Sequence, residues 1–295
     1  MVHDLSYAEG RAEASDGSPR DLVGTSAIAN GGRRYRSLRK SLVQAGYSIG
    51  AVAVAIGIWQ LVVWATGVAT YVVPAPADVY TTAHEHWSYL LQQTWPTLWE
   101  IVIGFGLAVA IGIPLAILIV AWRGFERGVY PLVVGFQGIP KVALAPMVIV
   151  WLGLGLISKV VLAALIAFFP VVIDTVIGLR SIDAGYVTLA RSMGANRRHV
   201  FWRMLLPNAL PQVFGGLKIA MSLAVVGAIV AELLGSNQGL GYLLNVASGQ
   251  LDMSLSFTIV LWLAALNVLL IGVISLAERL FVPWSHHGRA SEGKA

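Results

Sequence analysis

The chain has 295 residues, of which 57% are hydrophobic and only 12% are charged, whereas about a quarter of the residues of soluble domains are charged. This composition and a mean hydropathy of +0.74 exclude an ordinary soluble domain and indicate a membrane protein. The chain contains no cysteine, which excludes disulfides, thiolate metal ligands and cysteine nucleophiles. The net charge is +5, and its distribution along the chain is more informative than its size.

Residues 1–40 differ in composition from the rest of the chain. They are rich in Ser, Gly, Ala and charge, they end in a basic group, and they lack the apolar run of roughly 7–15 residues of a secretory signal. We interpret them as a disordered cytoplasmic tail. Nucleic-acid binding by the basic group is the alternative, but only Tyr35 supplies an aromatic side chain among these arginines, and we expect no nucleic-acid partner.

Six apolar segments follow, each near the roughly 20 residues that cross a hydrocarbon core. They are residues 46–71, 101–122, 128–158, 160–179, 212–234 and 253–277. The pattern predicts an all-α polytopic membrane protein with six transmembrane helices in residues 41–285 and a cytoplasmic tail at 286–295.

The third segment contains residues that disturb a helix. Pro131, Pro140 and Pro146 alternate there with Gly135 and Gly138. Proline removes a backbone donor and clashes with the preceding turn. We therefore expect a kinked span whose freed carbonyl groups face protein or a water-filled cavity.

The basic residues are distributed unevenly between the predicted loops. With the N-terminus inside, 17 of the 20 Lys and Arg residues fall on the inner side, Lys159 falls outside, and Lys141 and Lys218 lie within spans. The predicted outer loops at 72–96 and 235–252 contain no Lys or Arg. Because cytoplasmic loops of membrane proteins carry the excess of positive charge, both termini are predicted to be cytoplasmic.

Charged residues within predicted spans are candidates for a translocation path, because a charge at the bilayer centre costs about 2.5–3.5 kcal/mol. Lys141 lies about 16 Å from the inner surface at about 1.5 Å per helical residue, which is near mid-depth. One interpretation places Gln137, Lys141 and Asp174 along the path. The other pairs Lys141 with Asp174 as a structural ion pair.

The remaining charges near spans have simpler interpretations. Lys218 is expected to extend its stem to the inner headgroups. Glu100 and Glu232 lie near predicted outer ends, where we expect hydration. A stripe of small residues predicts a close helix-packing face in the fifth span: Gly215, Gly216, Ala220, Ser222 and Ala224.

The longest predicted cytoplasmic loop, about 180–211, carries an amphipathic helical pattern. Apolar residues recur at helical spacing with arginines between them, and Pro207 and Pro211 are expected to end the pattern. Such a helix docks on lipid headgroups or on a partner protein. Gly194 favours the partner, because a residue without a side chain permits close backbone approach.

This loop carries a resemblance to a known family. Ala190-Arg191-Ser192-Met193-Gly194-Ala195, followed nine residues after Gly194 by Met204-Leu205-Leu206-Pro207, resembles the "EAA" loop of ABC-importer permeases. Thr188 and Leu189 stand where the family pattern has Glu and Ala. The resemblance therefore implies an ATPase contact centred on Gly194. Its residues would be Ala190, Gly194, Ala195, Leu206 and Pro207.

Further segments are similar to the nitrate/sulfonate/taurine branch of these permeases. They are Val73-Pro74-Ala75-Pro76, residues 137–146, Trp151-Leu152-Gly153-Leu154-Gly155 and Gly239-Leu240-Gly241-Tyr242-Leu243. The resemblance implies the type I importer fold in a bacterial cytoplasmic membrane. It also implies a second permease copy, two ATP-binding subunits and an external substrate-binding protein. The helix at 180–199 would dock in a groove of the ATPase.

The chain lacks the Gly-x-x-x-x-Gly-Lys-Ser/Thr phosphate loop, so we expect no enzyme activity and no cofactor here, with ATP and Mg²⁺ on the partner subunit. His84-Glu85-His86 is a weak metal motif, and no metal site is expected.

An autonomous secondary transporter or channel that uses Lys141 and Asp174 as an ion relay is the alternative function. The resemblance leaves the substrate open among nitrate, sulfonates, taurine, bicarbonate, pyrimidines and riboflavin, because selectivity resides mostly in the binding protein.

Overall fold

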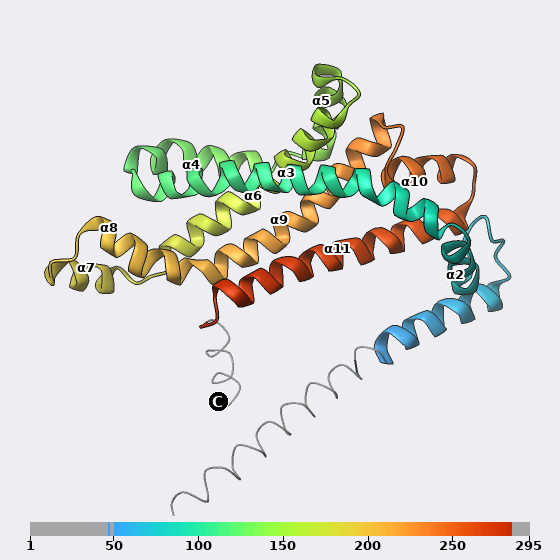
Figure 1. Cartoon of the computed structure of the whole chain (residues 1–295), viewed down its shortest axis with the longest axis horizontal. Coiled ribbons are helices and arrows are strands. Elements are labelled where there is room, and N and C mark those ends of the chain that lie inside the picture. The colour runs from blue at the N-terminus through green and yellow to red at the C-terminus, as the bar shows by residue number, and fades with distance from the viewer. Residues whose placement is uncertain (1–46, 48–49, 285–295) are drawn as a thin grey trace, which may run out of the picture. The chain divides into compact units, whose positions relative to one another are not determined.

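The computed structural model describes residue 47 and residues 50–284, and the regular elements of this part of the chain are all helices (Figure 1). The chain divides into two units, Met1–Val62 and Val63–Ala295, which are considered separately. Helix Gly50–Thr66 contains the boundary between them. The predicted tails at 1–40 and 286–295 lie outside the described residues, as do residues 46, 48 and 49 of the first predicted span.

The second unit contains the labelled helices of Figure 1. They are α2 (Pro76–Glu85), α3 (Trp87–Ala121), α4 (Arg123–Gln137), α5 (Ala145–Leu152), α6 (Leu156–Arg180), α7 (Ala184–Ser192), α8 (Arg197–Val200), α9 (Leu206–Gly235), α10 (Leu240–Gly249) and α11 (Met253–Phe281). A 3₁₀ turn, Lys141–Leu144, precedes α5, and a π-helical turn, Phe201–Leu205, joins α8 to α9.

Four helices of the described chain are long and apolar enough to cross a membrane. They are α3, α6, α11 and the continuous stretch Arg197–Gly235, which ends in α9. A fifth crossing is formed if α4 and Lys141–Leu152 count as one bent span, and Gly50–Thr66 is a shorter apolar helix of 17 residues. The predicted helical membrane fold is confirmed, and two predicted outer loops prove to be largely helical, since they contain α2 and α10.

The third predicted span, 128–158, is broken, as its prolines and glycines indicated. Its two halves, α4 and Lys141–Leu152, meet at an angle of 90°. Pro140 stands at the break, where it cannot donate to the turn before it. The side-chain nitrogen of Lys141 donates to the carbonyl oxygen of Gln137 at 2.7 Å, so one carbonyl group freed by the break is satisfied within the protein.

The expectation that Pro207 and Pro211 end the loop helix is wrong. The chain stays helical from Arg197 to Gly235. Pro207 lies just after the π-helical turn Phe201–Leu205, in which the N–H of Leu206 donates to the carbonyl of Phe201. The π-helical turn before it changes the hydrogen-bond register, which is how such turns accommodate irregular sequence. Pro211 stands inside α9.

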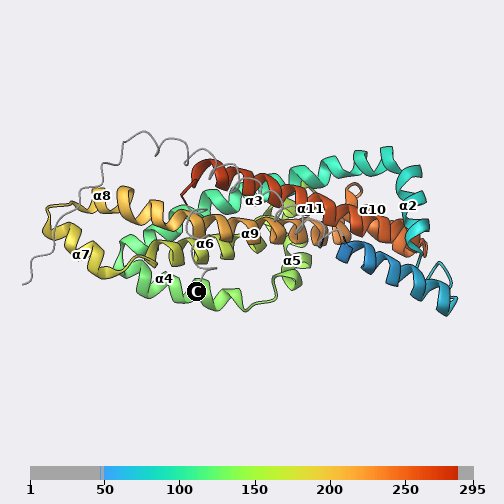
Figure 2. The same cartoon turned by 90° about the horizontal axis from the view of Figure 1, so that it is seen from below.

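The core forms where α6 packs against α3 and α9, and both views show α6 beside α9 (Figures 1 and 2). Small residues permit this approach. A Cβ atom added at Gly104 would lie 2.6 Å from the Cβ of Ala163, and one added at Gly227 would lie 2.7 Å from the Cα of Ala163. Helices in membranes associate through such close backbone contacts.

The predicted small-residue stripe of α9 is confirmed in part. Ala220 and Ala224 are fully buried in the main apolar cluster, and Gly216 packs directly on the side chain of Asp174 in α6. Gly215 faces away, since a Cβ added there would meet nothing within 4 Å. One face of α9 is therefore the packing surface.

Candidate functional site

The turn between α7 and α8 contains the residues that the resemblance assigned to partner docking. Asp183 caps α7 by accepting a hydrogen bond from the backbone N–H of Gly185 at 2.6 Å. At the other end, the N–H of Ala195 donates to the carbonyl of Ala190 at 3.0 Å, and the N–H of Gly194 donates to that of Arg191 at 2.9 Å. These two bonds form the Schellman motif that ends many helices.

Gly194 provides the left-handed conformation that this motif requires. Its φ is +88°, which L-residues with a side chain adopt at a cost of about 1–2 kcal/mol. Asn196 then caps the next helix, accepting from the N–H of His199 at 2.7 Å. The single helix implied over 180–199 is therefore two short helices, because Gly194 closes the first one and Asn196 starts the second.

A concave surface with a volume of about 460 Å³ lies at this turn. Ala190, Gly194 and Ala195 line it, and a Cβ atom added at Gly194 would meet nothing within 4 Å. The structure thus brings three of the five predicted contact residues to one open surface. Leu206 and Pro207 lie at the start of α9, half-buried, and do not line it.

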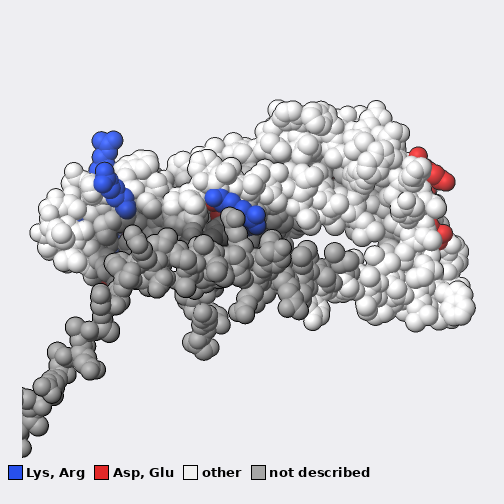
Figure 3. Space-filling view, turned by 60° about the horizontal axis from the view of Figure 1, so that its bottom comes forward, with Lys and Arg blue, Asp and Glu red and all other residues white. Residues whose placement is uncertain are grey.

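Charge is distributed unevenly between the two ends of the second unit. On the face drawn in Figure 3, one group of exposed Lys and Arg side chains lies at the end that carries α7 and α8, and a second lies nearer the middle. The most prominent Asp and Glu side chains lie at the opposite end, near α2. The turn at Gly194 is therefore part of the basic end of the molecule.

The structure separates the candidate path residues into two places. Lys141 is bonded to Gln137 at the break after α4, and its ammonium group lies 4.7 Å from the ring centroid of Phe169. Asp174 lies between α6 and α9, where its Oδ1 accepts from Gln212 at 2.9 Å. The proposed ion pair between Lys141 and Asp174 is wrong, because each group is satisfied by a nearer partner.

Lys218 has a partner on a neighbouring helix. Its ammonium group lies 2.5 Å from Oε2 of Glu278, so it pairs α9 with α11. Hydropathy does not reveal this carboxylate.

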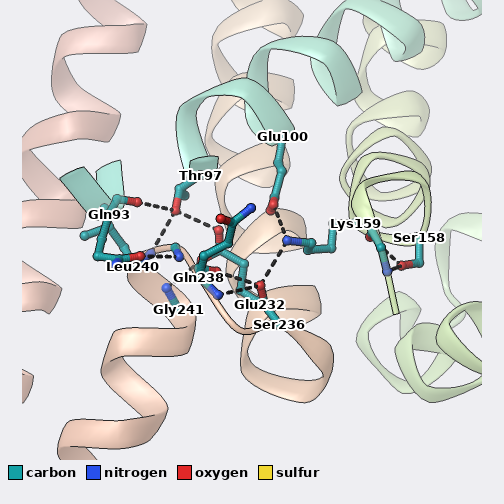
Figure 4. A network of polar contacts seen from close by, with 12 residues as sticks. Gln93, Thr97, Glu100, Ser158, Lys159, Glu232, Ser236, Gln238, Leu240 and Gly241 are labelled. Carbon is teal, nitrogen blue, oxygen red and sulfur yellow. Dashed lines mark hydrogen bonds and ion pairs between the residues drawn. The ribbon is translucent and has the colours of Figure 1, made fainter. Parts of the chain in front are cut away.

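A buried polar cluster, absent from the sequence-based expectations, lies where α3, α6 and α9 meet (Figure 4). Glu100 and Glu232, which we expected to be hydrated, are 1% and 0% exposed, and Lys159, which we expected outside, is 5% exposed. Lys159 forms a salt bridge with Glu100 and donates to the hydroxyl of Ser236 at 3.0 Å. For Glu100, the expectation failed because α3 starts at Trp87, well before the predicted span, and packs this part of the helix against Lys159 of α6.

Glu232 fastens the first turn of α10 to the helix core. Its Oε1 accepts from the hydroxyl of Thr97 at 2.7 Å, and its Oε2 accepts from the N–H of Gly241 at 2.6 Å. The same hydroxyl accepts from the N–H of Leu240 at 2.9 Å. Gly239 has φ +104° and packs directly on the Glu232 carboxylate, where a Cβ atom has no room. These hydrogen bonds hold α3, α9 and α10 together, and we call the cluster the joint of these helices.

The polar groups of this joint bond to one another across helices. It holds two carboxylates, one ammonium group and the hydroxyl groups of Thr97 and Ser236. Within the described residues, no group of three or more His, Cys, Asp or Glu side chains could hold a metal ion.

The described geometry can now be compared with known proteins. Residues 108–285 match the family described as "Binding-protein-dependent transport system inner membrane component". The formylaminopyrimidine transport permease protein ThiX of Halalkalibacterium halodurans is 37% identical over 77% of this chain and 91% of its own length. The riboflavin transport system permease protein RibX of Chloroflexus aurantiacus is 38% identical over 77% of this chain and 85% of its own.

One further comparison concerns the branch of the family, and another concerns the fold alone. The putative aliphatic sulfonates transport permease protein SsuC of Escherichia coli is 32% identical over 78% of this chain and 88% of its own length. A chain of the MetNI methionine ABC transporter in an inward-facing conformation superposes with a TM-score of 0.56 at 23% identity, covering 65% of this chain and 96% of its own. The chain therefore belongs to the inner membrane components of binding-protein-dependent transport systems, the permeases of ABC importers.

Proposed function

We propose that this permease is driven by a separate ATP-binding subunit that docks at the turn between α7 and α8. The observation that carries the proposal is the open surface around Gly194, built from a turn whose backbone is fixed by capping bonds at both ends. A rigid turn that leaves its glycine uncovered offers a partner a close backbone approach. ATP and Mg²⁺ belong to that partner, and this chain needs no cofactor.

The helix that follows the turn connects it to the membrane core. The stretch from Arg197 to Gly235 is continuous, its α9 portion packs along α6, and Glu232 near its far end is bonded to α10. Movement of the turn by a closing ATPase would thus reach the joint of α3, α9 and α10. Alternating access by shifts of packed helices is the mechanism that this arrangement supports.

The charge distribution supports an orientation in a bacterial cytoplasmic membrane. The basic end with α7 and α8 would face the cytoplasm, because positive residues are retained there. The acidic end near α2 would face the external binding protein. Both termini would be cytoplasmic, and a second copy of this chain would complete the translocation path.

The names of the relatives support a class of substrate. The permeases named for formylaminopyrimidine and riboflavin are 37% and 38% identical, against 32% for the aliphatic sulfonate permease. We infer a small organic solute, with a nitrogen heterocycle favoured over a sulfonate. An ion relay through Lys141 and Asp174 gains no support, because these residues have separate partners.

A mild-detergent pull-down of the tagged chain from its native membrane, followed by mass spectrometry, tests the proposal. We expect an ATP-binding subunit in stoichiometric amount. Recovery of the chain alone, from a preparation shown to preserve other ABC complexes, would contradict the proposal and favour an autonomous transporter.

A further inference from the structure

A second pocket, separate from the surface at Gly194, lies where the end of α3, the start of α4 and the segment Arg197–Leu205 meet. Its volume is about 910 Å³. Four arginines line it, and two tryptophans lie among them: Arg123, Arg191, Arg197, Arg198, Trp122 and Trp202. A volume of this size falls within the range of small-molecule sites in proteins.

The positive charge of this pocket is uncompensated. Within the described part of the chain, none of the four arginines forms an ion pair or a hydrogen bond through its side chain. The pocket contains one carboxylate, that of Glu126, and it is already paired with Arg180 at 3.0 Å. The arginine side chains are exposed and free to form charge-assisted hydrogen bonds with an anion.

The pocket also has an apolar wall that belongs to a membrane span. Ile117 and Val120 of α3 line it, together with Leu205. Trp122 and Trp202 are 60% and 58% exposed. Tryptophan gathers where headgroups meet acyl chains, and α3 ends at Ala121, so the pocket lies at that level of the membrane.

We propose that this pocket binds the headgroup of an anionic phospholipid. The arginines would contact its phosphate, and its acyl chains would lie along Ile117 and Val120. Basic pockets between transmembrane helices on the cytoplasmic side are suited to such headgroups. The apolar wall distinguishes this occupant from an acidic protein surface, which has no acyl chain to place there.

A bound lipid would contact two parts of the molecule at once. It would link the α3–α4 corner to the helical segment that begins at Arg197 and continues into α9. The inference rests on the proposed cytoplasmic orientation of α7 and α8. The pocket shares no lining residue with the surface at Gly194, so lipid binding and ATPase docking can fail separately.

Lipid titration of the purified full chain in mild detergent, read by native mass spectrometry, tests the inference with dioleoyl phosphatidylglycerol as the probe. Each charge near an anionic surface contributes about fivefold in affinity. We therefore expect Arg123→Gln and Arg197→Gln each to weaken binding about fivefold, and the double variant about 25-fold. Arg127→Gln is the matched control, because Arg127 is an exposed arginine of α4 outside the pocket, and it should bind as the unmodified chain does.

Other results would overturn the inference. Equal binding of zwitterionic dioleoyl phosphatidylcholine would remove the role of the headgroup charge. Competition by inorganic phosphate at the same concentration would indicate a free-anion site. Loss of the ATP-binding subunit from Arg197→Gln, with lipid binding retained, would assign the pocket to that subunit. Where a glutamine variant does not elute as a single species, Arg197→Lys replaces it, and we expect it to keep more affinity than any variant that removes the charge.

Discussion

Replacing Lys159 by Met is expected to lower the free energy of unfolding by about 3–5 kcal/mol. Lys159 is the only cation bonded to Glu100 among the described residues, and the carboxylate is buried. Removing the ammonium group leaves the negative charge of Glu100 uncompensated. The Oε2 atom of Glu100 already has no hydrogen-bond partner in the described structure. The loss is measured as a shift of the thermal unfolding midpoint of the purified chain in detergent.

Two variants show whether burial is the reason. Lys218→Met breaks the ion pair between Lys218 and Glu278. Because the ammonium group of Lys218 is partly exposed to water, the decrease in the free energy of unfolding should be smaller. The double variant Lys159→Met with Glu100→Gln should regain part of the stability, because it removes the orphaned charge as well. Equal losses for the two lysine variants, and no recovery in the double variant, would contradict the account of the joint.

Replacing Gly194 by Trp is expected to abolish substrate uptake. ATP hydrolysis by the ATP-binding subunit should then no longer be coupled to transport. The side chain would fill the open surface between Ala190 and Ala195, and the positive φ of this residue adds backbone strain. Uptake and ATP hydrolysis by the assembled transporter in liposomes provide the two measurements.

Matched variants separate bulk from conformation. Gly128→Trp in α4 adds the same side chain at an exposed glycine with nothing within 4 Å, and uptake should persist. Asparagine adopts the left-handed conformation more readily than other residues with a side chain. The Gly194→Asn variant should therefore keep the thermal stability of the unmodified chain, while the bulk of the asparagine side chain weakens uptake. Uptake by Gly194→Trp equal to that of the unmodified chain would rule out docking at this turn.

The membrane spans were the most predictable part of the fold, because hydropathy is a local property of the chain. The apolar stretches at 160–179 and 253–277 became α6 and α11 with small changes at their ends. The break after α4 followed from Pro140, since proline imposes its restriction wherever it stands. The start of α3 was missed because its first turns are polar and aromatic, and only packing makes them part of the helix.

The buried joint could not be predicted in the same way. Glu100, Lys159 and Glu232 come from three helices, and their pairing depends on the register between those helices. Each residue alone resembles a charge at the end of a span. The available signal was that all three stand next to long apolar runs on the same predicted side of the membrane, with a glycine pair at 239 and 241 close by.

The end of a helix at Gly194 could be predicted from the sequence. The continuation of the next helix through Pro207 could not. A glycine after a helical pattern indicates a helix end, and the Schellman bonds bear this out. Pro207 carried the same kind of signal, yet the chain continues as a helix through a π-helical turn. Packing of α9 on α6 decides between these outcomes, and it is absent from the local sequence.

Site-specific crosslinking tests the central claim most directly, because the chain has no cysteine and a single one can be introduced. Met193→Cys places it beside Gly194 at a side chain that is 81% exposed, and Tyr80→Cys places it in α2 at the opposite end, where the side chain is 73% exposed. With a short bifunctional thiol reagent in native membranes, we predict that Met193→Cys crosslinks to the ATP-binding subunit and that Tyr80→Cys does not. Crosslinking of that subunit to Tyr80→Cys, and none to Met193→Cys, would contradict both the docking surface and the orientation.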